Sequence, residues 1–148
     1  MKNKLTISLL LFFQLTIFSC SAGDKPGISD QVSLHGRDWV LKSLNNEKIF
    51  TPEASKDIFI RFDSGQNRFS GFAGCNNIFG TYTLIKDKIK FGPVAGTEMY
   101  CESRMETEKN FMKMFEVVSR ISVKNNELNF YDGNGNITAV FKALNIKQ

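Results

Sequence analysis

Short apolar stretches that alternate with polar residues recur along the chain from about residue 38 onward. The stretch from Ile60 to Asp63 shows the pattern, because apolar and polar side chains follow each other in turn. A period of two places one face of a strand against a core and the other face in solvent. The pattern predicts strands at 39–44, 57–63, 68–73, 79–84, 89–91, 121–123, 127–131 and 137–142. Weaker extended pieces are predicted at 48–50 and 97–100.

Turn residues separate these strands. Asparagine and glycine tolerate the positive φ that tight hairpins need, and Asp-containing pairs favour turns as well. The predicted turns are Asn45-Asn46, 64–67, Lys86-Asp87, Asn125-Asn126 and 132–135. A further turn is predicted from Gly74 to Asn77, held by side-chain to backbone hydrogen bonds. Residues 92–96 contain two glycines and Pro93, which predicts a break in the sheet.

One segment has the spacing of a helix instead. Its apolar residues recur at intervals that place them on one stripe, namely Met105, Phe111, Met112, Phe115 and Val118. Polar residues cover the opposite side, namely Glu106, Lys109, Asn110, Lys113 and Glu116. Ser103 and Glu106 have the spacing of a capping box, which predicts that Ser103 caps the helix. A helix that packs on the sheet explains the stripe better than a ligand-binding box.

The first twenty residues resemble an export signal. Two lysines precede an apolar run from Leu5 to Phe18, which is shorter than the about 20 residues of a membrane-spanning helix. The run ends in Ile17-Phe18-Ser19-Cys20, which resembles the lipobox of bacterial lipoproteins. We therefore expect a signal peptide at 1–19 and lipidation of Cys20, with an unlipidated secreted protein as the alternative. Ser21 after the cysteine fits sorting to the outer membrane.

The remainder is expected to form one tether and one domain. Residues 20–36 are small, polar and broken by Gly and Pro, as in a flexible linker. The folded domain is expected at 37–145. The 148-residue chain has a formal net charge of +4, and two of its positive charges, Lys2 and Lys4, belong to the expected signal peptide. The weak and evenly spread charge that remains excludes the basic surface of a nucleic-acid-binding protein.

Two cysteines remain beyond Cys20, namely Cys75 and Cys101. An even pair in an exported chain predicts a disulfide. Two buried, reduced thiols and a thiol-active pair are the alternatives. Metal ligation would need further ligands, and no Cys or His spacing typical of zinc occurs in the sequence.

No other pattern in the sequence indicates catalysis, a metal or a cofactor. His35, the only histidine, lies at the end of the expected tether and is therefore a poor base for a cysteine nucleophile. Residues 132–136 begin like a calcium loop, but Ile137 and Ala143 stand where that loop needs glycine and glutamate. A hairpin turn is the better interpretation. We expect no catalytic residue, no metal and no cofactor.

Several blocks of residues follow one another in a characteristic order. They are Trp39-x-Leu41, Ile60-x-Phe62, Ser70 to Asn76, Phe79-Gly80-x-Tyr82, Thr97-x-Met99-x-Cys101 and Met105-x-x-Glu108-x-x-Phe111. In these blocks the chain resembles the META domain, the family of HslJ-like heat-shock lipoproteins. The resemblance runs from about Trp39 to Phe141. Asn77 and Tyr100 differ from the residues common at their positions, and neither belongs to the main signature.

The resemblance implies an α+β fold, in which a curved antiparallel sheet has one main helix packed against it. It also implies that Cys75 is bonded to Cys101, so that the disulfide joins the sheet to the entrance of the helix. Asn76 is then expected to hold the turn around Cys75. Structural roles are implied for the other motif residues, namely Gly74, Gly80, Thr97, Met99 and Glu108. Members of the family are envelope proteins linked to stress response, with no accepted reaction.

These expectations combine into one functional hypothesis and two alternatives. The hypothesis is a non-enzymatic lipoprotein of the bacterial cell envelope, anchored to the outer membrane through Cys20, that binds an unknown envelope protein or small ligand or stabilises an envelope component. In the first alternative, the curved sheet encloses an apolar cavity, lined by some of the 14 phenylalanines, and carries a small ligand. In the second, Cys75 and Cys101 are thiol-active. A helix that seals the concave face favours the hypothesis, and an open pocket favours the carrier.

Overall fold

The computed structural model describes residues 33–53 and 55–144. Within these residues, nine strands and one helix follow one another along the chain. They are β1 (Asp38–Leu44), β2 (Glu47–Lys48), β3 (Phe59–Phe62), β4 (Arg68–Phe72), β5 (Asn77–Ile85), β6 (Lys88–Gly96), α1 (Met105–Val117), β7 (Val118–Lys124), β8 (Glu127–Asp132) and β9 (Ile137–Leu144). The expected signal peptide and Cys20 lie outside the described residues.

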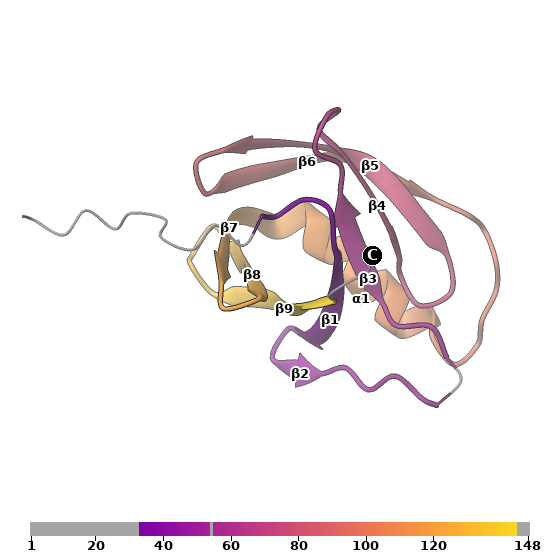
Figure 1. The fold of residues 1–148 in the computed structure, drawn as a ribbon. Coiled ribbons are helices and arrows are strands. Elements are labelled where there is room, and N and C mark those ends of the chain that lie inside the picture. The colour runs from indigo at the N-terminus through magenta and orange to yellow at the C-terminus, as the bar shows by residue number, and fades with distance from the viewer. Residues whose placement is uncertain (1–32, 54, 145–148) are drawn as a thin grey trace, which may run out of the picture.

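The strands form one antiparallel sheet that curves until it closes on itself (Figure 1). Pairing runs in the order β1-β3-β4-β5-β6-β7-β8-β9 and returns from β9 to β1, where Asp38 pairs with Leu144. The short β2 pairs only with the far end of β1. The β6–β7 contact is the weakest of the ring, because it consists of a single pair, Lys88 with Arg120. The predicted curved antiparallel sheet with one helix is confirmed, and its closure into a barrel goes beyond the prediction.

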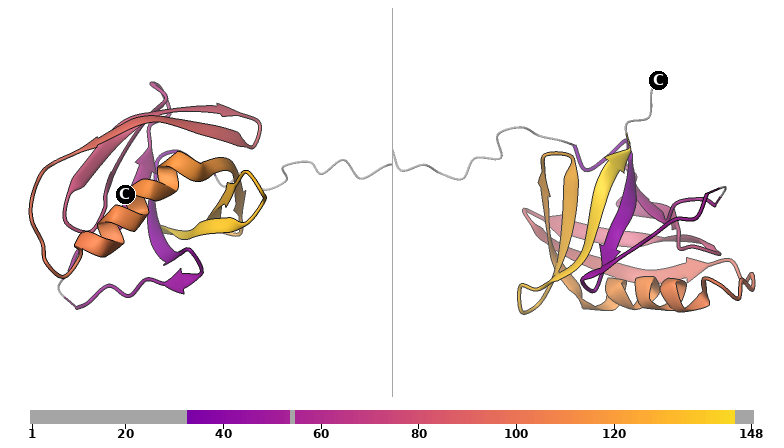
Figure 2. Two further views of the ribbon diagram at one scale, coloured as in Figure 1. Left: turned by 180° about the vertical axis from the view of Figure 1, so that it is seen from behind. Right: turned by 90° about the horizontal axis from the view of Figure 1, so that it is seen from below.

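The helix α1 lies across one end of the barrel (Figure 2), and its Phe111, Met114 and Phe115 side chains are buried in the core. The Phe115 ring lies 5.1 Å from the ring of Phe69 on β4 and 4.9 Å from that of Phe91 on β6. The Phe111 ring lies 6.2 Å from that of Phe141 on β9. Stacked and edge-to-face pairs at these distances add to the stabilisation that burial provides, about 1.5–3 kcal/mol for each such side chain. One aromatic core therefore joins the helix to both halves of the sheet.

The asparagine pairs form the tight turns that the sequence predicts. Asn45 and Asn46 have φ values of 50° and 67°, and Asn125 and Asn126 have values of 51° and 62°. Positive φ at both central residues is the signature of a type I′ hairpin, whose twist matches that of the flanking strands. These short-range signals place β1 against β2 and β7 against β8.

The helix begins later than the predicted capping box. Its N-cap position is Arg104, and no side chain caps the first turn, so the prediction that Ser103 and Glu106 cap each other is wrong. Ser103 lies instead inside a turn in which the Arg104 amide donates to the Cys101 carbonyl over 2.9 Å. This turn fixes the direction in which the chain enters the helix, and therefore the capping box that the local sequence predicts does not form.

The buried stripe of α1 also lies further along the helix than predicted. Met114, which the predicted stripe omits, is buried in the core, whereas Met105 at the start of the helix is exposed. Val118 is buried as the first residue of β7, because the helix ends at Val117. The first turn of α1 therefore reaches beyond the core, and the last two turns face it.

Strand β6 continues through the segment that is predicted to break it. It pairs with β5 on both sides of Pro93, as far as Gly96. The register shifts between Gly80 and Tyr82 on β5, which places one extra residue on β6 beside Pro93. Proline is tolerated at such a bulge, because the bulged residue need not donate to the ladder. The predicted break is therefore a bulge within one strand.

Residues 33–36 pack against the barrel, although their composition assigns them to the tether. Leu34 is buried in the core, and its carbonyl accepts a 2.8 Å hydrogen bond from the indole of Trp39. His35 forms an isolated parallel bridge with Phe62. The folded domain therefore begins earlier than residue 37.

Candidate functional site

Three segments that lie far apart in the sequence meet beside the helix entrance. They are the turn between β4 and β5, the segment 97–101 that follows β6, and the first turns of α1. We call their meeting point the motif junction, and its residues are Gly74, Cys75, Asn76, Thr97, Met99, Cys101 and Glu108. All seven belong to the blocks that the sequence singles out. These seven positions come from three separate blocks of the sequence, and the fold brings them together at one place.

The turn between β4 and β5 depends on Gly74. Its φ of +119° is a conformation that side-chain-bearing residues rarely adopt. The Ala73 amide donates to the Asn76 carbonyl over 2.8 Å and closes the turn. Of the predicted turn residues, Gly74 takes the positive φ, and the two asparagines do not.

The buried Asn76 side chain joins this turn to the segment 97–101. Its carbonyl oxygen accepts from the Thr97 hydroxyl and from the Met99 amide, both over 2.7 Å. Its amide nitrogen donates to the Met99 carbonyl over 3.1 Å and to Oε1 of Glu108 over 2.7 Å. A side-chain amide can make four hydrogen bonds, and here all four are made.

Glu108 holds the turn from the side of the helix. Its Oε2 accepts from the backbone amides of Cys75, over 3.1 Å, and of Asn76, over 2.8 Å. With the bond from the Asn76 side chain, the carboxylate accepts three N–H groups. Hydrogen bonds to an ionised acceptor are stronger than neutral ones. A signal for this role was present in the sequence, because Glu108 stands three residues before Phe111 and so on the buried side of the helix.

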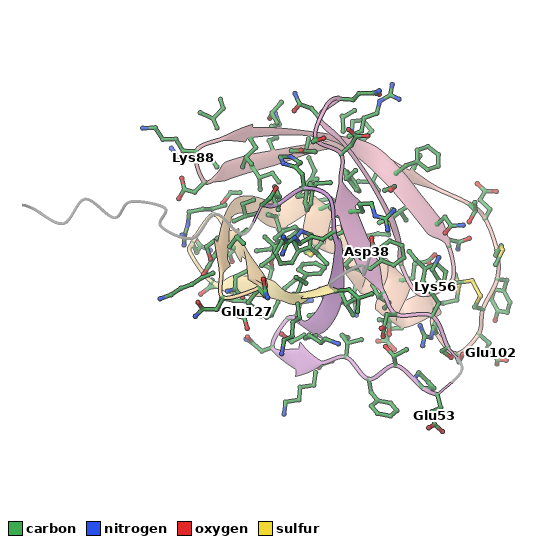
Figure 3. All side chains as sticks on the ribbon, in the orientation of Figure 1. Asp38, Glu53, Lys56, Lys88, Glu102 and Glu127 are labelled. Carbon is green, nitrogen blue, oxygen red and sulfur yellow. A yellow bond between two sulfur atoms is a disulfide. The ribbon has the colours of Figure 1, made fainter. Side chains whose placement is uncertain are left out.

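The disulfide closes the motif junction. Cys75 and Cys101 are bonded, with their Cα atoms 5.8 Å apart (Figure 3). The bond links the β4–β5 turn to the residue that accepts the Arg104 amide at the helix entrance. The pairing is the one implied by the cysteine count and the resemblance, and it leaves no free thiol at either position.

The motif residue Gly80 allows close packing, and Met99 acts through its backbone. A Cβ on Gly80 would lie 2.7 Å and 2.9 Å from atoms of the Phe69 ring, so the ring can pack over β5 only where a glycine stands. Met99 contributes its backbone N–H and C=O to Asn76, while its side chain is exposed. The side chain of Tyr100, next to it, is exposed as well.

The hydrogen bonds and the disulfide of the motif junction hold three segments of the chain together, and we call this structural role a clasp. Asn76 and the Glu108 carboxylate bond each other and the backbone around them, and both sulfurs are in the disulfide. Among the residues that the structure describes, no group of three His, Cys, Asp or Glu side chains could hold a metal ion. The arrangement can therefore position the exposed Met99 and Tyr100, but it presents no pair of nucleophile and base.

His35 lies away from the motif junction and contacts Tyr82. Its Nε2 lies 2.9 Å from the Tyr82 hydroxyl, which also donates to the Asp63 carbonyl over 3.3 Å. Burial, and then the charge of Asp63, raise the pKa of the Tyr82 hydroxyl above its usual value of 10.0. The phenol therefore keeps its proton near neutral pH and connects residues 33–36 to the β3–β4 turn. Sequence reasoning missed this contact, because it assigned His35 to the tether.

The Asp132 carboxylate accepts hydrogen bonds from the backbone of the turn in which it lies. The Asp132 carboxylate accepts from the amides of Asn134 and Asn136 and from the Asn136 side chain. These bonds lower the pKa of the Asp132 carboxyl, the Asn136 side chain contributing most. The segment is a hairpin turn between β8 and β9, as the sequence predicts.

Two grooves in the described part of the molecule lie at its surface. The larger, of about 310 Å³, runs between β6 and α1 and has Phe91, Val94 and Met112 in its lining. The smaller, of about 240 Å³, lies between the β1–β2 hairpin and the start of α1. The barrel interior is filled by aromatic rings, among them Phe62, Phe91 and Phe130. No helix within the described ranges is long and apolar enough to cross a membrane.

Comparisons with known proteins identify one family and find two structures with a similar fold. The family model of the META domain matches residues 32–144. The NMR structure of a protein from Burkholderia xenovorans superposes with a TM-score of 0.61 at 25% identity, covering 76% of this chain and 84% of that one. A second NMR structure superposes with a TM-score of 0.60 at 20% identity, covering 78% and 95%. None of the curated proteins matches the chain.

Proposed function

The chain belongs to the META domain family, and from this premise we propose that it is a non-enzymatic lipoprotein of the cell envelope. It is anchored through Cys20 and acts by binding an envelope component and stabilising it under stress. The observation that carries the proposal is the hydrogen-bond network that the family's motif residues form at the motif junction. Asn76 and Glu108 bond each other and the backbone around them, and so they hold a surface in place.

The exposed side chains of that surface support a binding role. Met99 and Tyr100 stand on a segment that is fixed by Asn76 at one end and by the disulfide at the other. Because the segment is already ordered, little conformational freedom is lost when a partner binds to it. An exposed aromatic on a rigid support is typical of binding surfaces.

The alternative of a small-ligand carrier draws its support from one observation. The lining of the groove between β6 and α1 includes the apolar side chains of Phe115 and Val118, beside the charged Lys90 and Glu116. It is open to solvent and lies outside the filled barrel interior, so it suits a partly exposed chain better than an enclosed ligand. A thiol-active role is disfavoured, because Cys75 is buried and bonded to Cys101.

Anchoring is tested by metabolic labelling. Cells that express the full chain are grown with radioactive palmitate, and Cys20→Ala is compared with Ser21→Ala as the matched control. We expect label and membrane fractionation for the parent and for Ser21→Ala, and neither for Cys20→Ala. Membrane fractionation of Cys20→Ala that equals that of the parent would overturn the lipoprotein assignment.

The non-enzymatic role is tested by comparing stability with stress survival. Asn76→Ala and Glu108→Gln should impair survival at the temperature where they unfold and restore it at a lower temperature where they are folded. A residue that takes part in a reaction would stay defective at both temperatures. Photo-crosslinking from position 100 in intact envelopes, with position 113 on the outer side of α1 as the control, should then identify the bound component.

A further inference from the structure

The start of the described chain lies on the same side of the barrel as the tip of the β5–β6 hairpin (Figures 1 and 2). His35 contacts Tyr82, which stands three residues before the tip residue Ile85. Arg37 donates to the side chain of Asn126 in the β7–β8 turn over 3.4 Å. The described chain therefore begins between these two hairpins.

The hairpin tip combines an exposed apolar side chain with positive charge. Ile85 is 73% exposed and closes the turn opposite Lys88. Lys86 occupies the turn itself, with a φ of 61°, and both lysines are exposed. The one carboxylate within residues 85–90 is that of Asp87. An exposed isoleucine that precedes Lys86 and lies opposite Lys88 suits an interface that is apolar inside and anionic at its surface.

Strand β7 continues this positive surface. Arg120 pairs with Lys88, and its guanidinium lies 4.0 Å from the centre of the Tyr131 ring. Lys124 ends the strand opposite Glu127, the one carboxylate of the β7–β8 turn. We call this surface the basic side, and it consists of Arg37, Ile85, Lys86, Lys88, Arg120 and Lys124.

The opposite side of the molecule carries a net negative charge, because its carboxylates outnumber its cations Lys56 and Arg104 (Figure 3). Segment 97–106 contains Glu98, Glu102 and Glu106 against the single cation Arg104. Figure 3 shows Lys88 at one extreme of the domain and Glu53 and Glu102 at the other. The expectation that the charge is evenly spread is therefore wrong for the fold, because cations gather near the hairpin tip and carboxylates near the motif junction.

We propose that the basic side docks the domain onto a lipid surface with anionic headgroups, with Ile85 inserted at headgroup level. The inference rests on the proposed anchoring through Cys20 and adds an orientation to it. The motif junction, with Met99 and Tyr100, then faces away from the anchoring membrane.

Electrostatics and tethering together make this docking effective. Each lysine or arginine close to an anionic membrane strengthens binding about fivefold, and the attraction fades within a screening length of about 8 Å at physiological salt. The attraction that these few cations provide is weak on its own. A lipid anchor holds the domain at high local concentration beside the membrane, so weak contacts then suffice to orient it.

Fluorescence quenching tests the orientation. The full chain is purified from membranes and reconstituted into phosphatidylcholine vesicles, with or without phosphatidylglycerol, that contain lipids brominated near the headgroup. Ile85→Trp places a reporter at the hairpin tip, and Tyr100→Trp, at an 80% exposed position on the opposite side, is the matched control. Trp39, the only native tryptophan, is fully buried and gives the same background in both.

We expect strong quenching of Ile85→Trp in the anionic vesicles, little in phosphatidylcholine alone, and none above background for Tyr100→Trp. Adding Lys86→Glu and Lys88→Glu should reduce the quenching to that of the control, whereas Lys109→Glu and Lys113→Glu on α1 should leave it unchanged. Flotation of the protein with the vesicles reports anchoring separately. Equal quenching at both positions, or no effect of the hairpin charges, would overturn the docking proposal while anchoring stands.

If the purified protein carries no lipid and does not float, the anchoring proposal has failed, and the docking proposal is tested on the soluble protein. At low salt, quenching of Ile85→Trp by anionic vesicles that depends on Lys86 and Lys88 supports docking. Absence of quenching under these conditions overturns it.

Discussion

Replacing Glu108 by glutamine tests whether the motif junction is a structural clasp. The change keeps the size of the side chain, removes its charge and turns one carboxylate oxygen into an NH₂ group. In either orientation this NH₂ group faces an N–H donor, which is the backbone amides of Cys75 and Asn76 or the side-chain amide of Asn76. A compensating flip of the Asn76 amide would break its bonds to Thr97 and Met99. At least one hydrogen bond to a charged acceptor is therefore lost.

The magnitude follows from that loss. A hydrogen bond to a charged group contributes about 1.5–3 kcal/mol, and the partial exposure of Glu108 places it near the lower end. We expect the free energy of unfolding of Glu108→Gln to fall by about 2 kcal/mol. In a domain of this size that corresponds to a fall in Tm of roughly 8–10 °C.

Scanning calorimetry and urea titration of the same protein measure the effect. Glu106→Gln is the matched control, because Glu106 is exposed and lies in the same first turn of α1, and it should change stability by less than about 0.5 kcal/mol. A double-mutant cycle with Asn76→Ala should show that the two changes are not additive. Equal losses in Glu106→Gln and Glu108→Gln, or strictly additive energies in the cycle, would refute the clasp.

Two other substitutions or treatments probe the core and the disulfide. Phe115→Ala should lower the free energy of unfolding by roughly 3–5 kcal/mol, whereas Lys113→Ala on the solvent face of α1 should cost less than about 0.5 kcal/mol in the same urea titration; small losses in both would show that α1 does not fill the barrel. Cys75 and Cys101 are 26 positions apart, so reduction should lower stability by roughly 3–4 kcal/mol through the freed loop. Two titratable thiols at these positions in denatured, unreduced protein would contradict the disulfide.

The sequence predicts the parts of this fold that depend on neighbouring residues. The Asn45-Asn46 and Asn125-Asn126 turns need only the backbone freedom of asparagine, so a local pattern suffices to find them. The strands around them follow from alternation. The helix is predicted as well, because its apolar stripe repeats over several turns. The position at which the helix begins is not predicted. The turn that joins Cys101 to Arg104 sets the start, and a capping pattern at Ser103 cannot reveal it.

Features that depend on contacts between residues far apart in the sequence cannot be predicted from local patterns. The pairing of β1 with β9 brings together residues at opposite ends of the domain, and no local pattern records it. Pro93 is a strong local breaker, yet β6 pairs with β5 on both sides of it, across a bulge. At the motif junction the resemblance supplied the residues but not their contacts. That Glu108 accepts the amides of the Cys75 turn is visible only in three dimensions.

The seam between β1 and β9 has a kinetic consequence. Asp38 pairs with Leu144, so the first strand of the ring acquires one of its two neighbours only when the last strand is present. Contacts between such distant positions carry a high loop-closure entropy and slow the folding of all-β topologies. A nascent chain that still lacks β9 leaves the edge of β1 unpaired and the buried ring of Phe141 missing from the core. Folding of this domain is therefore delayed until β9 has been synthesised and can pair with β1.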